Sequence, residues 1–306
     1  MTFGEPGDRG RMLTTRRKVA IARALHRGAM AARVLAGKGP QTRVRRRGLD
    51  WQLDLREGID FAIWLTGAFE PGTVKAYEKL VRSGGVALDI GANIGAHTLP
   101  LARAVGPKGK VYAFEPTGFA MEKLRRNLAL NPDLERRVVC VQAMLIDRPG
   151  GKAPPLYASW PLGDTRGVHR LHRGRKKPAD EARATTLDDF LAEHGAVRPD
   201  FIKLDIDGFE CRMLKGARRT LERARPVVLL ELSPHQLDEQ GGSIEELAEI
   251  LRAAGYALHE LGSGKELPLD GAALRKLIPF GASRNAVALP RPEPRAAAKA
   301  RKAGRA

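Results

Sequence analysis

The feature that most constrains the fold is the stretch Val86 to Thr98, in which a short apolar run ends in a glycine-bearing turn. The run has the length of a buried parallel strand, and Asp89 is its only charged residue. Gly91 and Gly95 allow the backbone to turn sharply and to approach a ligand closely. The apolar spacing after the turn predicts a helix, so the free amides at the start of this helix are expected to face a ligand.

The spacing within this turn argues against a dinucleotide site. Such a site has the pattern G-x-G-x-x-G, whereas Asn93 stands in place of its second glycine and no third glycine is in register. A strand carboxylate followed by Gly91-x-Asn93-x-Gly95 resembles motif I of the class I methyltransferases that use S-adenosylmethionine. That ligand has a zwitterionic methionine end, which Asp89 and Asn93 could bind.

Two further strands extend this reading along the chain. Lys110 to Pro116 is predicted to be the second strand, and Glu115 at its end is expected to accept hydrogen bonds from a ribose diol. The alternative is a surface glutamate at a strand end. The third predicted strand is Val138 to Ala143. Gln142 and Ala143 lie at its end, and this position alone suggests that they flank an adenine ring.

The positive charge of the chain is concentrated at its two ends. The formal net charge is +18, but residues 1–50 hold 13 Lys and Arg against 3 Asp and Glu, and residues 290–306 hold 6 against 1. We therefore predict a basic extension over residues 1–41, partly helical or disordered, a domain over residues 42–289 and a basic disordered tail over residues 290–306. The ends could contact RNA, anionic lipid or a protein, or could simply be solvated. Val19 to Leu35 could form a basic amphipathic helix that lies on a membrane surface or on the domain.

Cysteine content and hydropathy indicate the compartment. Cys140 and Cys211 are too few and too far apart for a disulfide framework or a zinc site. No run approaches the ~18 apolar residues of a membrane span, and the basic residues within the first apolar segment exclude a secretory signal. These features predict a cytoplasmic protein without a transmembrane segment.

Two parts of the domain lie outside the central pattern. Residues 42–72 are predicted to form a small β lead-in, with Gly58 to Leu65 as a short strand or turn. A helix over Thr73 to Val81 follows. Residues 144–185 are irregular, rich in proline, glycine and basic residues, and are expected to form a cap that faces the acceptor.

A second informative stretch runs from Asp200 to Glu210. It is an apolar strand with charges at its far end, followed by a glycine and a helix from about Phe209 to Leu221. Lys203, Asp205 and Asp207 would share one side of an ideal strand. Such a cluster at a strand end is costly unless the groups pair with one another or serve a ligand.

This ordered set of motifs resembles the FkbM-type methyltransferases over roughly Trp51 to Leu232. The motifs are Gly-Ala-Asn-Ile-Gly-Ala-His-Thr from Gly91, Ala-Phe-Glu-Pro from Ala113, Asn-Leu-Ala-Leu-Asn from Asn127, Thr-Leu-Asp-Asp-Phe from Thr186 and the run Asp200 to Glu210. The resemblance implies an α/β, Rossmann-like class I methyltransferase fold with a mostly parallel seven-stranded sheet and an antiparallel last strand. It also implies methyl transfer from S-adenosyl-L-methionine, usually to a hydroxyl of a sugar, glycolipid or secondary metabolite.

Site roles follow from these positions. The expected cofactor-binding residues are Asp89, Gly91, Asn93, Gly95, Thr98, Glu115, Gln142 and Ala143. Asp205 is the first candidate for acceptor binding or general base, because it stands at the end of the fourth strand, and His235 after the fifth strand, Val227 to Leu232, is the alternative. No metal is predicted, although Asp205, Asp207 and Glu231, with His235, could hold a divalent ion if they converge.

Three functions remain open on the sequence alone. The leading one is an O-methyltransferase that acts on a small-molecule or glycan acceptor. The alternatives are a nucleic-acid methyltransferase recruited by the basic ends, and a non-catalytic module that binds the cofactor without turnover. Nucleic acid is the less favoured partner, because the chain lacks the amide-Pro-Pro-aromatic motif of nucleic-acid amino-methyltransferases.

Overall fold

The computed structural model describes residues 15–292 except for residues 149, 151–155, 164, 165, 170–173, 180 and 196, and only the backbone of residues 15–18. Residues 1–14 of the predicted extension and residues 293–306 of the predicted tail lie outside this part. In the described part, no helix is long and apolar enough to cross a membrane.

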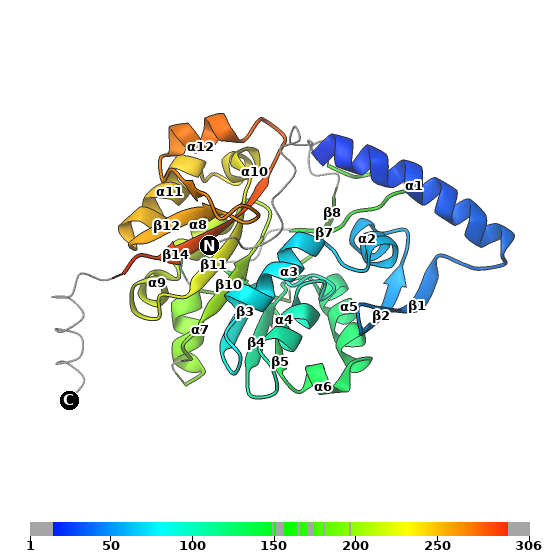
Figure 1. Cartoon of the computed structure of the whole chain (residues 1–306), viewed down its shortest axis with the longest axis horizontal. Coiled ribbons are helices and arrows are strands. Elements are labelled where there is room, and N and C mark those ends of the chain that lie inside the picture. Colours follow the sequence, from blue (N-terminus) through cyan, green and yellow to red (C-terminus); the bar gives the residue numbers. More distant parts are fainter. Residues whose placement is uncertain are drawn as a thin grey trace.

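An eight-stranded sheet forms the centre of the molecule, in the order β13-β12-β14-β11-β10-β3-β4-β5 (Figure 1). The five strands from β11 to β5 are parallel, and β14 runs antiparallel to both of its neighbours. The mostly parallel α/β sheet with an antiparallel last strand is thus confirmed, and the short β13 adds an eighth strand. The bounds are β3 (Val86–Ile90), β4 (Lys110–Phe114), β5 (Val138–Val141), β10 (Phe201–Leu204), β11 (Val227–Leu232), β12 (Tyr256–Glu260), β13 (Glu266–Leu267) and β14 (Arg284–Pro290).

Helices cover both faces of this sheet, and two buried cores result. Successive residues of β3 alternate between the cores, with Ala87 in one and Leu88 and Ile90 in the other, as the period of two along a strand requires. One face carries α3 (Pro71–Leu80), α4 (Thr98–Ala104), α5 (Gly118–Ala129) and α6 (Pro132–Glu135). The other core includes residues of α7 (Leu187–Glu193), α8 (Glu210–Lys215), α9 (Arg218–Arg223), α10 (Pro234–Glu239), α11 (Ile244–Ala253) and α12 (Gly271–Leu277).

The N-terminal part packs beside the first of these faces. It consists of α1 (Thr15–Leu35), the antiparallel hairpin of β1 (Gln41–Arg46) and β2 (Leu49–Asp54), and α2 (Gly58–Thr66). Backbone amides of β2 donate to side-chain oxygens on and just after α5, Gln52 N to Asn127 Oδ1 at 2.9 Å and Asp50 N to Asn131 Oδ1 at 3.0 Å. These bonds hold the hairpin against the domain.

The prediction of a strand or turn over Gly58 to Leu65 was wrong, because this segment is α2. Its β-branched isoleucines favour a strand. In the structure, however, Phe61 and Ile63 are buried side chains of a helix that is capped by Gly67. Gly67 adopts a left-handed φ of 87° and its amide donates to Ile63 O. That glycine is a helix stop signal which the apolar pattern obscured.

The cap contains more regular structure than the sequence suggested. β6 (Ala143–Leu145) pairs in parallel with β9 (Arg183–Thr185), and β7 (Leu156–Ser159) pairs antiparallel with β8 (Arg175–Lys177). The third central strand therefore ends at Val141, and Ala143 already belongs to the next small sheet.

The helix predicted over Phe209 to Leu221 is divided at Gly216, where α8 ends. A side chain at that glycine would meet the carbonyl oxygen of Ile146 at 2.1 Å. The close approach of another segment therefore requires glycine at this position.

Among the described glycines, Gly91 has the least room for a side chain, and a substitution there tests this close approach. Its φ is 86°, and an added Cβ would lie 1.9 Å from the carbonyl oxygen of Asp205. We expect Gly91→Ala to lower the free energy of unfolding by about 3 kcal/mol, through strain and overpacking, as measured by urea unfolding. Gly72→Ala is the control, because no atom lies within 4 Å of its added Cβ. Equal stability of the two variants would contradict this expectation.

Candidate functional site

A cavity of about 580 Å³ opens at the carboxyl ends of the central strands. This volume is within the usual range of small-molecule sites, about 300 to 1,000 Å³. Its walls come from α1 and α2, from the loops after β3, β4, β10 and β11, from the cap, and from the loop before β14. Segments far apart in the sequence therefore meet at one edge of the sheet, where parallel α/β folds place their ligands.

The glycine turn after β3 is fixed to the end of β4. The amides of Gly91 and Ala92 both donate to the carbonyl oxygen of Phe114, at 3.0 and 2.9 Å. Asn93 has a left-handed φ of 47°, and its amide donates to Glu115 Oε2 at 3.0 Å. The side chain of Asn93 then accepts from the amide of Ile94. The turn is thus held rigidly before any ligand binds.

Glu115 links this turn to the start of α5 and also lines the cavity. Its other oxygen accepts from the amide and the hydroxyl of Thr117, at 2.9 and 2.6 Å. Burial raises the pKa of Glu115, while the hydrogen bonds from Thr117 and Asn93 act in the opposite direction. Each carboxylate oxygen has two lone pairs, so the group can accept further bonds from a ligand in the cavity.

Among the described residues, Lys203 on β10 is the one buried Lys or Arg side chain. It lies at the carboxyl ends of the central strands. Its side chain is 3% exposed, and its Nζ lies 3.3 Å from Asp205 Oδ2 and 3.7 Å from Asp89 Oδ1. Nζ also donates to the carbonyl oxygen of Gly91 at 3.3 Å. Burial lowers the pKa of this ammonium, but the carboxylates of Asp205 and Asp89 outweigh that effect and the net pKa is raised. The contacts join β3, β10 and the glycine turn.

A second group of side chains on the wall of the cavity surrounds Glu70. Its carboxylate accepts from Asn285 Nδ2 at 2.8 Å and from Thr73 Oγ1 at 3.1 Å. His97 Nε2 lies 3.9 Å from Glu70 Oε2 and has no hydrogen-bond partner among the described residues. The other ring nitrogen of His97 shares a hydrogen bond with the hydroxyl of Tyr77 at 2.8 Å. Burial holds the pKa of His97 well below its usual value, so this imidazole is neutral at pH 7.

Further carboxyl groups that line the cavity come from β11 and from the loop after β10. Burial and the nearby charge of Asp205 raise the pKa of both Asp207 and Glu231 well above the usual range. Asp207 has a left-handed φ of 52° and accepts from Gln236 Nε2 at 3.1 Å. His235 also lines the cavity, with its Nδ1 3.3 Å from Ser233 Oγ. In the described part of the chain, no group of three or more His, Cys, Asp or Glu residues is arranged to hold a metal ion.

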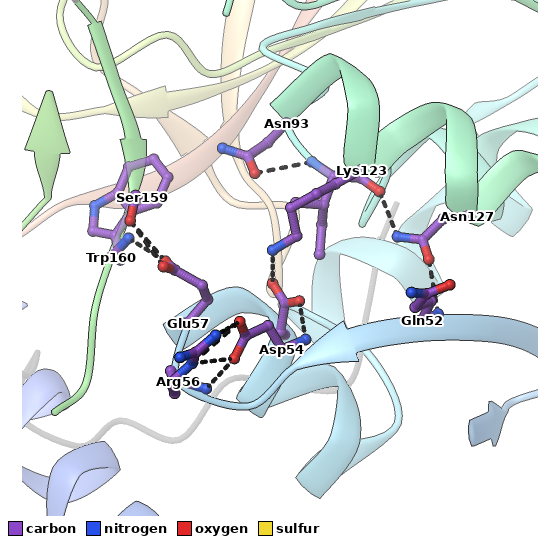
Figure 2. A network of polar contacts seen from close by, with 11 residues as sticks. Gln52, Asp54, Arg56, Glu57, Asn93, Lys123, Asn127, Ser159 and Trp160 are labelled. Carbon is purple, nitrogen blue, oxygen red and sulfur yellow. Dashed lines mark hydrogen bonds and ion pairs between the residues drawn. The ribbon is translucent and has the colours of Figure 1, made fainter. Parts of the chain in front are cut away.

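The cap, which lines part of the cavity, is hydrogen-bonded to the N-terminal part, and Figure 2 shows these bonds. The carboxylate of Glu57 accepts from Ser159 Oγ at 2.9 Å and from the amide of Trp160 at 2.9 Å. The amide of Gly58 donates back to Trp160 O at 2.8 Å. Described cap residues that line the cavity are Leu156, Tyr157, Trp160, Pro161, Leu162 and Lys176.

A buried ion pair joins α2 to α5. Lys123 Nζ lies 2.9 Å from Asp60 Oδ2, and the Asp60 side chain is 1% exposed. The second oxygen of Asp60 accepts from the amide of Asp54 at 2.7 Å. Removing one partner of such a pair leaves a buried charge uncompensated. The pair therefore sets the position of the residues of α2 that line the cavity.

The structure brings most of the predicted site residues to one cavity. Those that line it are Gly91, Asn93, Glu115, Ala143, Asp205, Asp207, Glu231 and His235.

Four predicted cofactor residues lie outside the lining. Asp89 is fully buried behind Lys203 and accepts from Thr98 Oγ1 at 2.6 Å. Gly95 packs against leucine side chains of α4 and α5. The side chain of Gln142 points to Glu181, with 3.5 Å between Nε2 and Oε2.

Sequence reasoning assigned no role to Glu70 or His97. His97 lies inside the glycine motif, and this position was the available signal. Glu70 comes 20 or more residues before that motif and carries no pattern of its own. Only the folded chain shows that it reaches the same cavity.

The chain matches a known family over more than half of its length. Residues 89–258 match the Methyltransferase FkbM domain. Methyltransferase sdnD of Sordaria araneosa is 31% identical over 189 residues, which are 53% of this chain and 71% of that protein.

Solved structures give a weaker resemblance. Methyltransferase FkbM from Methylobacillus flagellatus KT aligns with a TM-score of 0.39 and 17% identity, over 71% of this chain and half of the other. A SAM-dependent O-methyltransferase from Thermotoga maritima aligns with a TM-score of 0.41 and 15% identity, over 85% of this chain and 82% of the other. Both TM-scores are low, and the sequence matches are the stronger finding.

The buried carboxyl group of Glu210 makes the stability of the protein depend on pH. Burial raises its pKa from 4.5 to about 7, although the amides of Ile206 and Gly208 donate to its carboxylate. Between these two values the folded state binds more protons than the unfolded state, so stability falls as the pH rises through this range. The difference corresponds to about 3 kcal/mol.

We expect Glu210→Gln to remove this dependence. Urea unfolding from about pH 4 to about pH 8 should show the native protein losing about 3 kcal/mol relative to the variant as the pH rises. The exposed Glu122→Gln variant should follow the native protein. If Glu210→Gln and the native protein have parallel pH curves, the assignment is wrong.

Proposed function

Because the chain belongs to the FkbM methyltransferase family, we propose that it uses S-adenosyl-L-methionine to methylate a hydroxyl oxygen of a sugar, a glycolipid or a secondary metabolite. The observation that carries the proposal is the Glu115 carboxylate, held against the glycine turn and facing the cavity. The two free cysteines support a cytoplasmic location as part of the same proposal, because thiols remain reduced there.

The residues around the glycine turn fit this cofactor. Glu115 would accept hydrogen bonds from the ribose hydroxyls, and Ala143 would lie beside the adenine ring. Gly91 and Asn93 would face the methionine end, where a side chain on Gly91 would obstruct the backbone. Of the remaining predicted cofactor residues, Asp89, Gly95 and Thr98 would act from behind this layer by holding the turn and Lys203. Gln142 would contribute through its backbone beside the adenine ring, because its side chain points to Glu181.

The chemistry that the cofactor supplies when bound is an electrophilic methyl group on a sulfonium. In the transfer, the bond from sulfur to the methyl carbon breaks, a bond to the acceptor oxygen forms, and the hydroxyl proton must leave. Asp205 would take that proton or orient the hydroxyl, since its half-buried carboxylate lines the cavity and is held by Lys203 at 3.3 Å.

Two imidazoles are alternatives to Asp205 as the proton acceptor. His235 lines the cavity near Ser233, and its ring lies 5.8 Å from that of Phe280. His97 also lines it, and its neutral ring would accept a proton at Nε2 in the tautomer whose Nδ1–H donates to the hydroxyl of Tyr77. The nucleic-acid acceptor and the non-catalytic module remain the competing functions, and methylation of a small molecule would exclude both.

The acceptor can be sought directly. Metabolites and glycans from cells with and without the gene should be compared by mass spectrometry for a compound that differs by one CH₂ increment. Purified protein with methyl-labelled cofactor should then label the unmethylated compound. If label enters RNA instead and no small molecule is labelled, the proposed acceptor class is wrong.

The ribose contact predicts a loss of cofactor binding in Glu115→Ala. Loss of hydrogen bonds to a charged group should weaken binding by about 10- to 100-fold, as measured by isothermal titration with S-adenosylmethionine. Glu122→Ala, on the exposed side of α5, should leave the affinity unchanged. Unchanged affinity in Glu115→Ala, with an unchanged melting temperature, would contradict the ribose assignment.

The proton step predicts a different outcome for Asp205→Asn. The variant should keep its cofactor affinity within about threefold and lose about 100-fold or more in transfer rate. His235→Asn and His97→Asn, assayed in parallel over a range of pH, identify the base, because loss of the base also removes its limb from the pH profile. If Asp205→Asn transfers methyl groups at the native rate, one of the two histidines is the general base instead.

A further inference from the structure

Helix α1 presents an apolar stripe to solvent. Ile21, Leu25 and Leu35 are 52%, 51% and 90% exposed. With the exposed small residues Ala24, Gly28 and Ala32 they follow the spacing of one helix face. Seven large hydrophobic side chains are exposed among the described residues, and four of them lie on α1. The concentration on one helix distinguishes this stripe from the scattered apolar residues of an ordinary surface.

The opposite side of α1 is attached to the domain. His26 is 7% exposed, and its ring meets that of Phe61 edge-on with 5.3 Å between centroids. Val19 and Ala22 line the cavity itself. Figure 1 shows α1 along the outside of the molecule, beside α2 and above the hairpin of β1 and β2. The apolar stripe is therefore the outer face of a docked helix.

Positive charge accompanies this stripe. The sequence of α1 contains six Lys and Arg residues and no Asp or Glu. Arg27 beside the stripe, Lys38 after the helix and Arg43 on β1 are exposed, and none of them has an acidic partner among the described residues. An apolar face with unpaired basic flanks is typical of helices that lie in the interface of an anionic membrane.

We propose that α1 is a membrane-docking helix that binds an anionic lipid surface through its outer stripe. A second copy of the chain is the competing occupant, but two such helices would bring their basic residues together without any acidic side chain to pair with them. An anionic lipid surface complements the same charges and accepts the apolar side chains. Because Val19 and Ala22 belong to this helix, docking would place the cavity next to the lipid surface.

The proposal is independent of methyl transfer and is tested by sedimentation with vesicles. The full-length protein should sediment with vesicles of phosphatidylcholine and phosphatidylglycerol in equal parts, and should remain in the supernatant with phosphatidylcholine alone. Ile21→Glu/Leu25→Glu should lower the partition coefficient roughly tenfold or more. The matched control, Leu65→Glu/Leu277→Glu, adds the same charge at exposed leucines of α2 and α12 and should change it less than about threefold.

A third variant tests the proposal at a position where the substitution should not unfold the protein. Leu35→Glu changes a side chain that is 90% exposed, and it should still lower partitioning several-fold. Equal vesicle binding by the native protein, Leu35→Glu and Ile21→Glu/Leu25→Glu would overturn the proposal. It would also be overturned if sedimentation equilibrium showed a dimer that Ile21→Glu/Leu25→Glu dissolves, without vesicle binding by the native protein.

Discussion

The site depends above all on one buried ammonium group. Lys203 has almost no contact with solvent, so its charge is stable only because the carboxylates of Asp205 and Asp89 lie beside it. The same Nζ donates to the carbonyl oxygen of Gly91. These three contacts connect the ends of two neighbouring strands to the glycine turn. Without the ammonium group, Asp89 would be a buried charge with only Thr98 as a hydrogen-bond donor.

The predicted cofactor residues lie in two layers of the structure. Glu115 and Asn93 line the cavity, whereas Asp89 and Thr98 form a layer beneath it. The sequence pattern contains residues of both layers, and the two layers hold each other in place. It does not record which side chains a ligand would touch, since that depends on the turn of the backbone at Gly91.

Strands β3 and β11 begin and end where expected, because their apolar runs are short and glycine or proline lies next to them. The error at α2 has a physical cause: its isoleucines carry the local preference of a strand, while Gly67 and packing beneath the cap decide for a helix. Glu70 could not be assigned from the sequence, because its approach to His97 and Asn285 depends on contacts between distant segments. The amphipathic character of α1 was predictable, but the direction of its apolar stripe was not, since either face could have packed on the domain.

The boundaries of the family match divide the residues that line the cavity into two groups. The glycine turn, Glu115, Lys203 and Asp205 all lie within residues 89–258, whereas Glu70, the α1 and α2 walls and Ser283 lie outside them. Family membership therefore bears on the half of the cavity that would hold the cofactor. The other walls are built by segments outside residues 89–258, and Glu57 joins these segments to the cap. A change of a lining side chain on α1 or α2 would therefore alter the shape of the cavity without touching Lys203 or its partners.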